Sequence, residues 1–211
     1  MTDLPERVLC LVTDLQLAGG SQSLLRVIAS AARGGVNMLQ VRARELAVEE
    51  LARLASDART VAEGRALIVV NGSLEAAIES KADGIHLPEQ FADAQDVAEA
   101  AHGRGLIVGR SVHSTESASR AVAEGADYLF MGTVFASRTH PGGTVCGPEG
   151  VQKAVNTAAG VPVMGIGGIT PANATSVMRS GARGVAVIGA IIGAPNATAA
   201  ARRLSTAISS A

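Results

Sequence analysis

The stretch 161-VPVMGIGGIT-170 reads as a short apolar strand that runs into a glycine pair, and 184-GVAVIGAI-191 repeats this form shortly downstream. Between them, 180-SGARG-184 places a glycine where a helical pattern ends and the next strand begins. The same joint recurs at 81-KADG-84 and 124-EGADY-128. Parallel strands need long crossover connections, usually through a helix. The recurring joint therefore predicts parallel strands that alternate with helices.

Eight such strand–helix units fit the chain. The expected strands are rich in Val, Ile and Leu and span 8–14, 38–43, 66–72, 84–88, 106–113, 128–135, 161–168 and 184–191. Amphipathic patterns predict helices at 47–64, 114–126 and about 195–209, with Ser114 as an N-cap and Gly125 as a C-terminal glycine. Eight units in 211 residues predict an α/β fold, a single (β/α)8 TIM barrel over residues 1–211. A doubly wound sheet is the rival, but 14-DLQLAGG-20 matches its glycine fingerprint poorly.

Composition narrows the kind of partner. The net charge is −1, with 18 basic and 19 acidic residues, which is not the footprint of a nucleic-acid binder. No apolar run reaches the length of a membrane span, about 18 residues. The start, MTDLPER, lacks the pattern of a signal peptide, so we expect a cytoplasmic protein. Cys10 and Cys146 give no disulfide framework and are expected to be reduced.

Glycines at the last two strand ends predict a phosphate site. Barrels often bind phosphate on backbone N–H groups in the loops after strands seven and eight. Gly167 and Gly168 close the expected seventh strand, and Ile188 and Gly189 close the eighth. Glycine would let an oxyanion approach the amides without a Cβ in the way. The alternative is that these glycines only form tight turns.

Polar residues end two earlier strands. The second expected strand ends in 40-QVRAR-44, where Gln40, Arg42 and Arg44 are candidate substrate ligands. Two guanidinium groups at this rim would bind a second anion, a carboxylate or a diphosphate. The alternative is a pair of solvated surface charges. Asn71, which ends the third strand, offers a neutral donor and acceptor, although Asn-Gly is also a turn signal.

Three histidines are candidate proton carriers. His86 lies in the fourth expected strand and His113 ends the fifth, and for both a structural role in the barrel remains an alternative. His140 lies in the longest irregular stretch, 136–150, after the sixth strand. A loop this long in a compact domain is usually functional, and an unperturbed imidazole titrates near neutral pH.

Taken in order, the motifs resemble those of the thiamine-phosphate synthase superfamily. They are 39-LQVRAREL-46, 69-VVNG-72, 83-DGIHLP-88, 109-GRSVHS-114, 126-ADYLFMGTVFASRTHPG-142, 165-GIGGI-169 and 184-GVAVIGAI-191. The resemblance implies a barrel that takes a small-molecule thiazole phosphate in thiamine biosynthesis. It adds Ser111, Ser137 and Thr139 to the candidate phosphate- and substrate-binding residues. The oligomeric state stays open, with a homodimer as one option.

The superfamily has two main branches. The synthase branch joins a pyrimidine diphosphate to a thiazole phosphate using Mg²⁺. The tautomerase-like branch aromatises a thiazole phosphate carboxylate by moving a proton. The synthase pattern has aspartates where this chain has Gly72 and Phe91. Mg²⁺ needs oxygen ligands, so losing both carboxylates should largely abolish the site that the resemblance implies.

These departures favour a metal-independent thiazole tautomerase-like isomerase without a cofactor. Arg42 or Arg44 would hold the substrate carboxylate. Thr133 stands where the tautomerase-like branch has a histidine, so His140 is the expected proton carrier, ahead of His86 and His113. One alternative is a thiamine-phosphate synthase, a transferase whose Mg²⁺ site is rebuilt from Asp93 or Asp14. The other alternative is a non-catalytic binder of a phosphate ligand.

Overall fold

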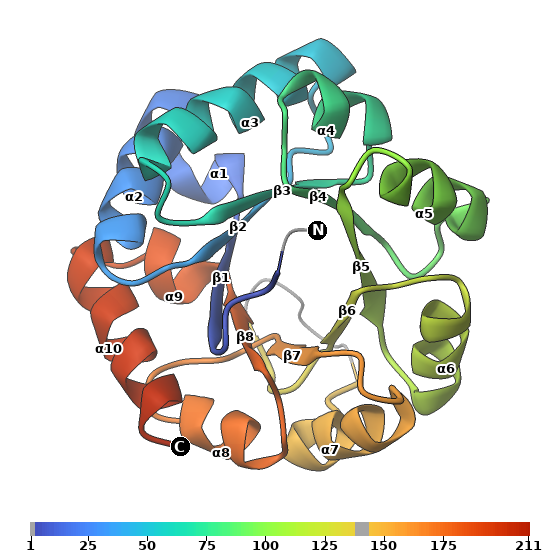
Figure 1. Cartoon of the computed structure of the whole chain (residues 1–211). Helices are drawn as coiled ribbons and strands as arrows, with labels where there is room; N and C mark the ends of the chain where they lie inside the picture. The colour runs from blue at the N-terminus through green and yellow to red at the C-terminus, as the bar shows by residue number, and fades with distance from the viewer. Residues whose placement is uncertain (1–2, 138–143) are drawn as a thin grey trace.

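The chain folds as a closed barrel of parallel strands. The computed structural model describes residues 3–137 and 144–211. Within these residues, eight strands pair in chain order, and β8 pairs with β1 to close the sheet. Figure 1 looks along the barrel, with the strands in the middle and the helices in a ring around them. The predicted (β/α)8 TIM barrel is therefore confirmed.

The strands are short and almost completely buried. They are β1 (Val8–Val12), β2 (Met38–Val41), β3 (Leu67–Asn71), β4 (Gly84–Leu87), β5 (Ile107–Val112), β6 (Tyr128–Met131), β7 (Val163–Ile166) and β8 (Gly184–Val187). Because both faces of a parallel sheet are covered, most of the strands are apolar runs rather than alternating ones, whereas β5 contains Arg110 and Ser111. The predicted eighth strand, 184–191, is too long, since a helix begins at Gly189.

Helices follow the strands around the outside. They are α1 (Leu15–Ala18), α2 (Ser21–Arg33), α3 (Val48–Ala62), α4 (Leu74–Glu79), α5 (Ala94–His102), α6 (Thr115–Ala123), α7 (Gly147–Thr157), α8 (Ala174–Arg179), α9 (Gly189–Ile192) and α10 (Ala197–Ser209). Ser114 caps α6, since its side chain accepts a hydrogen bond from the N–H of Ser117. Gly125 follows that helix with φ 86°, as predicted. Helices α1 and α9 are four residues each, too short for a periodic signal in the sequence.

The barrel interior is a core of its own, separate from the layer between strands and helices. Its apolar members come from seven of the strands: Val8, Cys10, Val12, Met38, Val69, Ile107, Tyr128, Phe130, Met164 and Ala186. His86 packs among them, with ring centroids 5.6 Å from Tyr128 and 4.7 Å from Phe130. Cys10 and Cys146 are free thiols, as expected, and burial raises the pKa of both.

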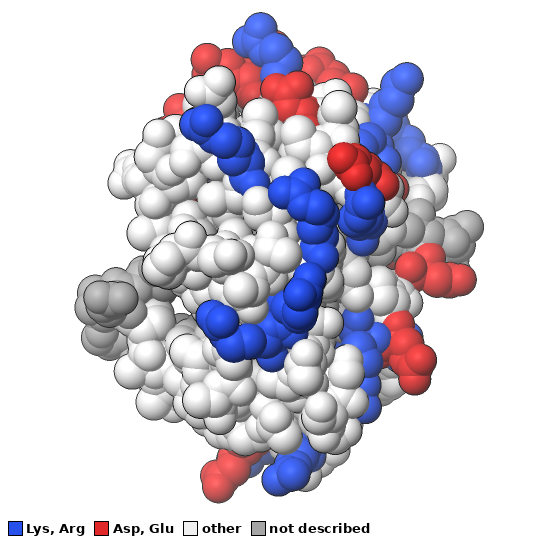
Figure 2. Space-filling view, turned by 90° about the vertical axis from the view of Figure 1, so that its left-hand side faces the viewer, with Lys and Arg blue, Asp and Glu red and all other residues white. Residues whose placement is uncertain are grey.

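One side of the barrel is basic. Helices α2 and α10 pack against each other and carry Arg26, Arg33, Arg202 and Arg203, while neither contains Asp or Glu. Figure 2 faces this side and shows a band of basic side chains across it. Although the net charge is near zero, the basic and acidic side chains are therefore distributed unevenly over the surface. Across the described residues, none of the helices has the length and apolar character needed to span a bilayer.

Gly109 tests how tightly the interior is packed. A Cβ at Gly109 would lie 2.0 Å from Cζ of Tyr128, so we expect Gly109→Ala to lower the free energy of unfolding by at least about 2 kcal/mol. Gly103→Ala is the matched control, because its Cβ would be 3.5 Å from the nearest atom and its φ is −59°. We expect that control to stay within about 1 kcal/mol of the wild type. Equal stability of the two variants in urea unfolding would contradict this packing.

Candidate active site

Polar side chains form a row at the carboxyl end of the barrel interior. Gln40 is the penultimate residue of β2, Asn71 ends β3, and the Cα of Asn71 is paired with that of His86 in β4. The Nδ2 of Asn71 donates to Oε1 of Gln40 over 3.4 Å. The Nε2 of His86 lies 2.8 Å from Oγ of Ser111 in β5. The active sites of such barrels lie at this end of the strands, so the row marks the candidate site.

Gln40 leaves one donor unused. Its side chain is 3% exposed, and its Nε2 has no hydrogen-bond partner among the described residues. A buried polar group without a partner costs about 1–3 kcal/mol. A ligand that offers an acceptor to Nε2 would recover this cost. Gln40 is therefore suited to bind a ligand.

His86 is held as a neutral imidazole. It is 1% exposed, and its Nδ1 lies 3.1 Å from the hydroxyl of Tyr128. Burial, followed by the nearby charge of Arg110, lowers the pKa of His86 to about 3. An imidazole with this pKa does not exchange protons readily near neutral pH. The geometry gives His86 a hydrogen-bonding role and argues against the proton-carrying role that the sequence suggested.

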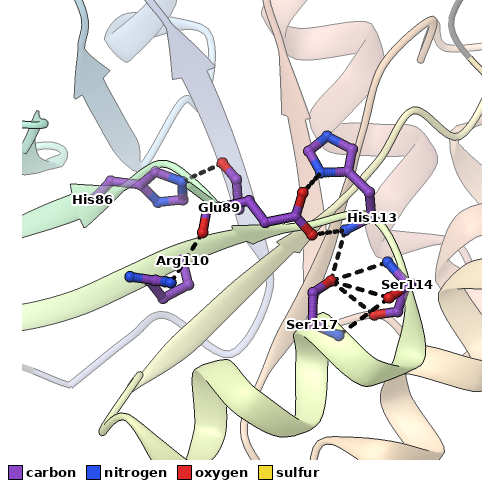
Figure 3. Close-up of polar contacts among 7 residues, drawn as sticks. His86, Glu89, Arg110, His113, Ser114 and Ser117 are labelled. Carbon is purple, nitrogen blue, oxygen red and sulfur yellow. Dashed lines mark hydrogen bonds and ion pairs between the residues drawn. The ribbon is translucent and has the colours of Figure 1, made fainter. Parts of the chain in front are cut away.

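Glu89 joins the loops after β4 and β5 (Figure 3). Its carboxylate accepts hydrogen bonds from the backbone N–H of His113 at 3.2 Å and from the imidazole Nδ1 of that residue at 2.8 Å. Burial alone would raise the pKa of Glu89, but hydrogen bonds from Ser117 and His113 outweigh it and hold the pKa below its ordinary value. The carbonyl of Glu89 also accepts from Arg110. His113, 58% exposed, is thus tethered at the rim.

Arg42 and Arg44 lie after the end of β2. Arg42 is half-buried, and its backbone N–H donates to Oγ1 of Thr13 at 2.8 Å. Its pKa is lowered by burial first and then by the charge of Arg44, and Asp14 and Glu45 oppose the shift. Neither arginine belongs to an ion pair within 3–137 and 144–211. Two neighbouring guanidinium groups that repel each other are a favourable place for an anion.

The glycines after β7 exclude side chains for a reason that the sequence did not reveal. Gly167 and Gly168 have φ of 101° and 63°. A Cβ at Gly168 would lie 2.5 Å from the carbonyl oxygen of Phe135, and one at Gly167 would lie 2.6 Å from Cγ2 of Thr133. The neighbour that needs the space is thus the chain after β6, whose Phe135 N–H donates to the carbonyl of Gly167.

Backbone donors nevertheless remain free at this corner of the barrel. The N–H groups of Gly168, Gly189 and Ala190 donate to no backbone acceptor among the described residues. Ile188 caps α9, and a Cβ at Gly189 would have no neighbour closer than 3.9 Å. The ends of β7 and β8 are adjacent because the strands pair. This corner therefore has the donors that the predicted phosphate site requires.

Two of the predicted site residues, Thr139 and His140, lie outside the described residues. Ser137 lies at the last described position before them. The structure thus brings together Gln40, Asn71, His86 and Ser111, and it places Arg42 and Arg44 on the same rim. Sequence reasoning missed Glu89 and Tyr128. The available signal for Tyr128 was that the only tyrosine of the chain lies in a predicted barrel strand.

The described rim does not fit the carboxylate pair that the resemblance implies for Mg²⁺. Gly72 and Phe91 occupy the two positions. Asp14 accepts from the N–H of Leu17 as the cap of α1, and Asp93 is an exposed residue at the start of α5. No group of three or more His, Cys, Asp or Glu side chains in the described chain could hold a metal ion.

Solved structures with the same fold superpose on nearly the whole chain. The thiamine phosphate pyrophosphorylase from Pyrococcus furiosus superposes with a TM-score of 0.86 and 30% identity, over 97% of this chain and 96% of that one. A 3-hexulose-6-phosphate synthase superposes with a TM-score of 0.74 at 23% identity, over 95% and 99% of the two chains. The second similarity is a likeness of fold alone.

Curated relatives correct the predicted activity. The thiamine-phosphate synthase of Moorella thermoacetica is 38% identical over 203 residues, 95% of each chain. That of Natronomonas pharaonis is 37% identical over 202 residues, 94% of this chain and 93% of the relative. The predicted tautomerase-like isomerase is therefore wrong, and the transferase alternative is the better one. The error came from the two missing carboxylates, which concern a few rim positions, whereas the similarity extends over nearly the whole chain.

The sequence profile of one family, described as thiamine monophosphate synthase, matches residues 9–191. This range runs from β1 into α9 and leaves out only the first residue of β1 among the strands. It also includes the row from Gln40 to Ser111 and the corner formed by the ends of β7 and β8. The chain belongs to the thiamine monophosphate synthase family.

Proposed function

We propose that this protein is a thiamine-phosphate synthase, a transferase that joins hydroxymethylpyrimidine diphosphate to a thiazole phosphate and releases pyrophosphate. Its similarity to relatives of that name supports the transferase over the isomerase. The structural observation that carries the proposal is the polar row at the barrel mouth, with the unpartnered Nε2 of Gln40. The reaction takes two substrates, a pyrimidine diphosphate with ring acceptors and a thiazole phosphate, which match a polar row between two anion-binding ends of the site.

Each end of the site has a part in this proposal. Arg42 and Arg44 bind the diphosphate, because guanidinium groups pair well with phosphoryl oxygens. The free N–H groups of Gly168 and Gly189 bind the thiazole phosphate. Gln40, Asn71 and Ser111 contact the pyrimidine and orient it. Ser137 and Thr139, from the loop after β6, remain predicted contacts to phosphate, and the role of His140 stays a prediction.

The chemistry asks the protein to stabilise a leaving anion. The carbon–oxygen bond to the diphosphate breaks, pyrophosphate leaves with the bonding electrons, and the thiazole forms the new bond to that carbon. Positive groups already in position lower the free energy of charge that develops on the leaving group. Arg42 and Arg44 supply such charge. The described carboxylates do not fit the expected Mg²⁺ site, so in this proposal the described positive charge near the leaving group is that of the two arginines.

The direct test is product formation. Purified protein is incubated with thiazole phosphate and hydroxymethylpyrimidine diphosphate, with Mg²⁺ and with a chelator, and products are followed by mass spectrometry. We expect thiamine phosphate and pyrophosphate in equal amounts. Binding of the thiazole phosphate without any product under either condition would instead identify a non-catalytic binder. Activity that survives the chelator would match the missing carboxylates, and strict dependence on Mg²⁺ would mean that other ligands hold the ion.

Charge at Gly189 tests the phosphate corner. Space is open around this position, so Gly189→Asp adds a carboxylate without a clash, at a helix start that tolerates acidic residues. We expect KM for the thiazole phosphate to rise by about tenfold or more, since like charges then face each other. Gly189→Asn is the matched neutral control and should change KM only a few-fold. Equal KM values for the two variants would show that the phosphate does not bind at the ends of β7 and β8.

Arg42 tests the other end. We expect Arg42→Gln to raise KM for the diphosphate substrate by about tenfold or more, because a charge-assisted contact to phosphate is lost. KM for the thiazole phosphate should change much less. Arg53→Gln, an arginine on α3, is the control and should leave both constants unchanged. If only the KM for the thiazole phosphate rises, then Arg42 binds the thiazole phosphate and the diphosphate binds at the other end of the site.

A further inference from the structure

Three side chains connect the buried centre of the barrel to its mouth. Tyr128 is fully buried, His86 is 1% exposed, and Ser111 is partly exposed. The hydroxyl of Tyr128 lies 3.1 Å from Nδ1 of His86, and Nε2 of His86 lies 2.8 Å from Oγ of Ser111. Among the described residues, neither hydroxyl oxygen has another hydrogen-bond partner. These three groups therefore determine one another's hydrogen-bond directions.

A glycine in β5 makes the contact possible. The Cα of Gly109 is paired with that of His86 on one side and with that of Tyr128 on the other. A Cβ at Gly109 would lie 2.4 Å from the Tyr128 hydroxyl oxygen. The two side chains consequently meet across β5, over the one position that has no side chain.

The number of protons decides the direction of the bonds. A neutral imidazole has one N–H, so one ring nitrogen donates and the other accepts. If Nδ1 accepts a hydrogen bond from Tyr128, then Nε2–H donates to Oγ of Ser111. The O–H of Ser111 can then donate to a group at the barrel mouth. If Nδ1–H donates to Tyr128, the O–H of Tyr128 has no acceptor within the described residues. Burying that donor without a partner lowers the population of the second tautomer by about 5- to 150-fold, so the first tautomer predominates.

Protonation states support the same reading. Burial and the charge of Arg110 lower the pKa of His86 to about 3, so the ring is neutral at physiological pH. Burial, with smaller effects of Cys10 and Asp127, raises the pKa of Tyr128 well above its ordinary value, so its O–H stays protonated. The choice is thus between two neutral tautomers.

We propose that Tyr128 and His86 are positioning residues that fix the Ser111 hydroxyl as a hydrogen-bond donor to the substrate. The substrate atom that faces Ser111 must then be an acceptor, such as a phosphoryl oxygen or an unprotonated ring nitrogen. A substrate that offers N–H there would meet a donor and be rejected. The role of Ser111 toward substrate rests on the proposed function, whereas the tautomer of His86 does not.

Nitrogen NMR of ¹⁵N-histidine-labelled protein tests the tautomer without any substrate. The chain has four histidines, and His86 is assigned by elimination with His102→Gln, His113→Gln and His140→Gln. We expect Nε2 protonated and Nδ1 unprotonated in the wild type. In Tyr128→Phe the constraint is gone, and we expect a population with protonated Nδ1 to appear. Protonated Nδ1 in the wild type, or an unchanged ratio in Tyr128→Phe, would overturn the proposal.

A double-mutant cycle tests the link to substrate. We expect Tyr128→Phe to lower kcat/KM in the synthase assay by about three- to tenfold, the effect of one hydrogen bond. In a Ser111→Ala background the same change should have no further effect, because the group it orients is gone. If the effects of Tyr128→Phe and Ser111→Ala multiply, Tyr128 acts through stability alone and the positioning role is wrong.

Phe130→Leu is the matched control. Phe130 packs on the same imidazole but makes no hydrogen bond to it. Its effect on kcat/KM should be equal in both backgrounds, and the His86 tautomer should not change. If the wild type shows no turnover at all, the proposed function fails, while the NMR result still decides whether Tyr128 sets the tautomer.

Discussion

Closure of the sheet between β1 and β8 is the constraint on which the rest of the structure depends. The two strands pair from Val8 with Gly184 to Leu11 with Val187. The approach is so close that a Cβ at Gly184 would lie 2.0 Å from the carbonyl oxygen of Val8. Closure brings all strand ends into one ring. Within that ring, β2 pairs directly with β3, so the side chains of Gln40 and Asn71, 31 residues apart in sequence, are hydrogen-bonding neighbours.

A closed interior also restricts what polar groups can do. Water is excluded, so each buried donor needs a protein or ligand acceptor. Tyr128, His86 and Ser111 satisfy this need in sequence from the centre to the mouth. Gln40 does not, since its Nε2 lacks a partner in the described part of the chain. An unpartnered donor of the polar row therefore lies at β2, close in sequence to Arg42.

Repetition made the fold readable from the sequence. Each helix-to-strand joint has a glycine and each strand is an apolar run, and these are local signals. The end of β8 was overestimated because an apolar helix start, Gly189–Ile192, looks like more strand. The sequence indicated that side chains are excluded at Gly167 and Gly168, and attributed this to an approaching phosphate. Their neighbours Thr133 and Phe135 are contacts between loops, and no local pattern encodes such contacts.

The site was less predictable because its chemistry depends on surroundings. His86 is a candidate proton carrier by sequence, but its low pKa follows from full burial and the charge of Arg110. Tyr128 went unnoticed, since a tyrosine in an apolar strand reads as core. Its hydroxyl becomes informative only when the register places it across Gly109 from His86.

The wrong choice of branch has a physical explanation. Mg²⁺ at phosphate sites usually keeps several waters and takes only one or two protein carboxylates, together with substrate oxygens. Acids at the positions of Gly72 and Phe91 would bind the metal rather than the diphosphate itself, so their absence is weak evidence against a diphosphate substrate. The need to counter the charge of a diphosphate is the firmer constraint, and it can be met by fixed cations. Arg42 is half-buried beside Arg44, so an anion bound there relieves the repulsion between the two guanidinium groups.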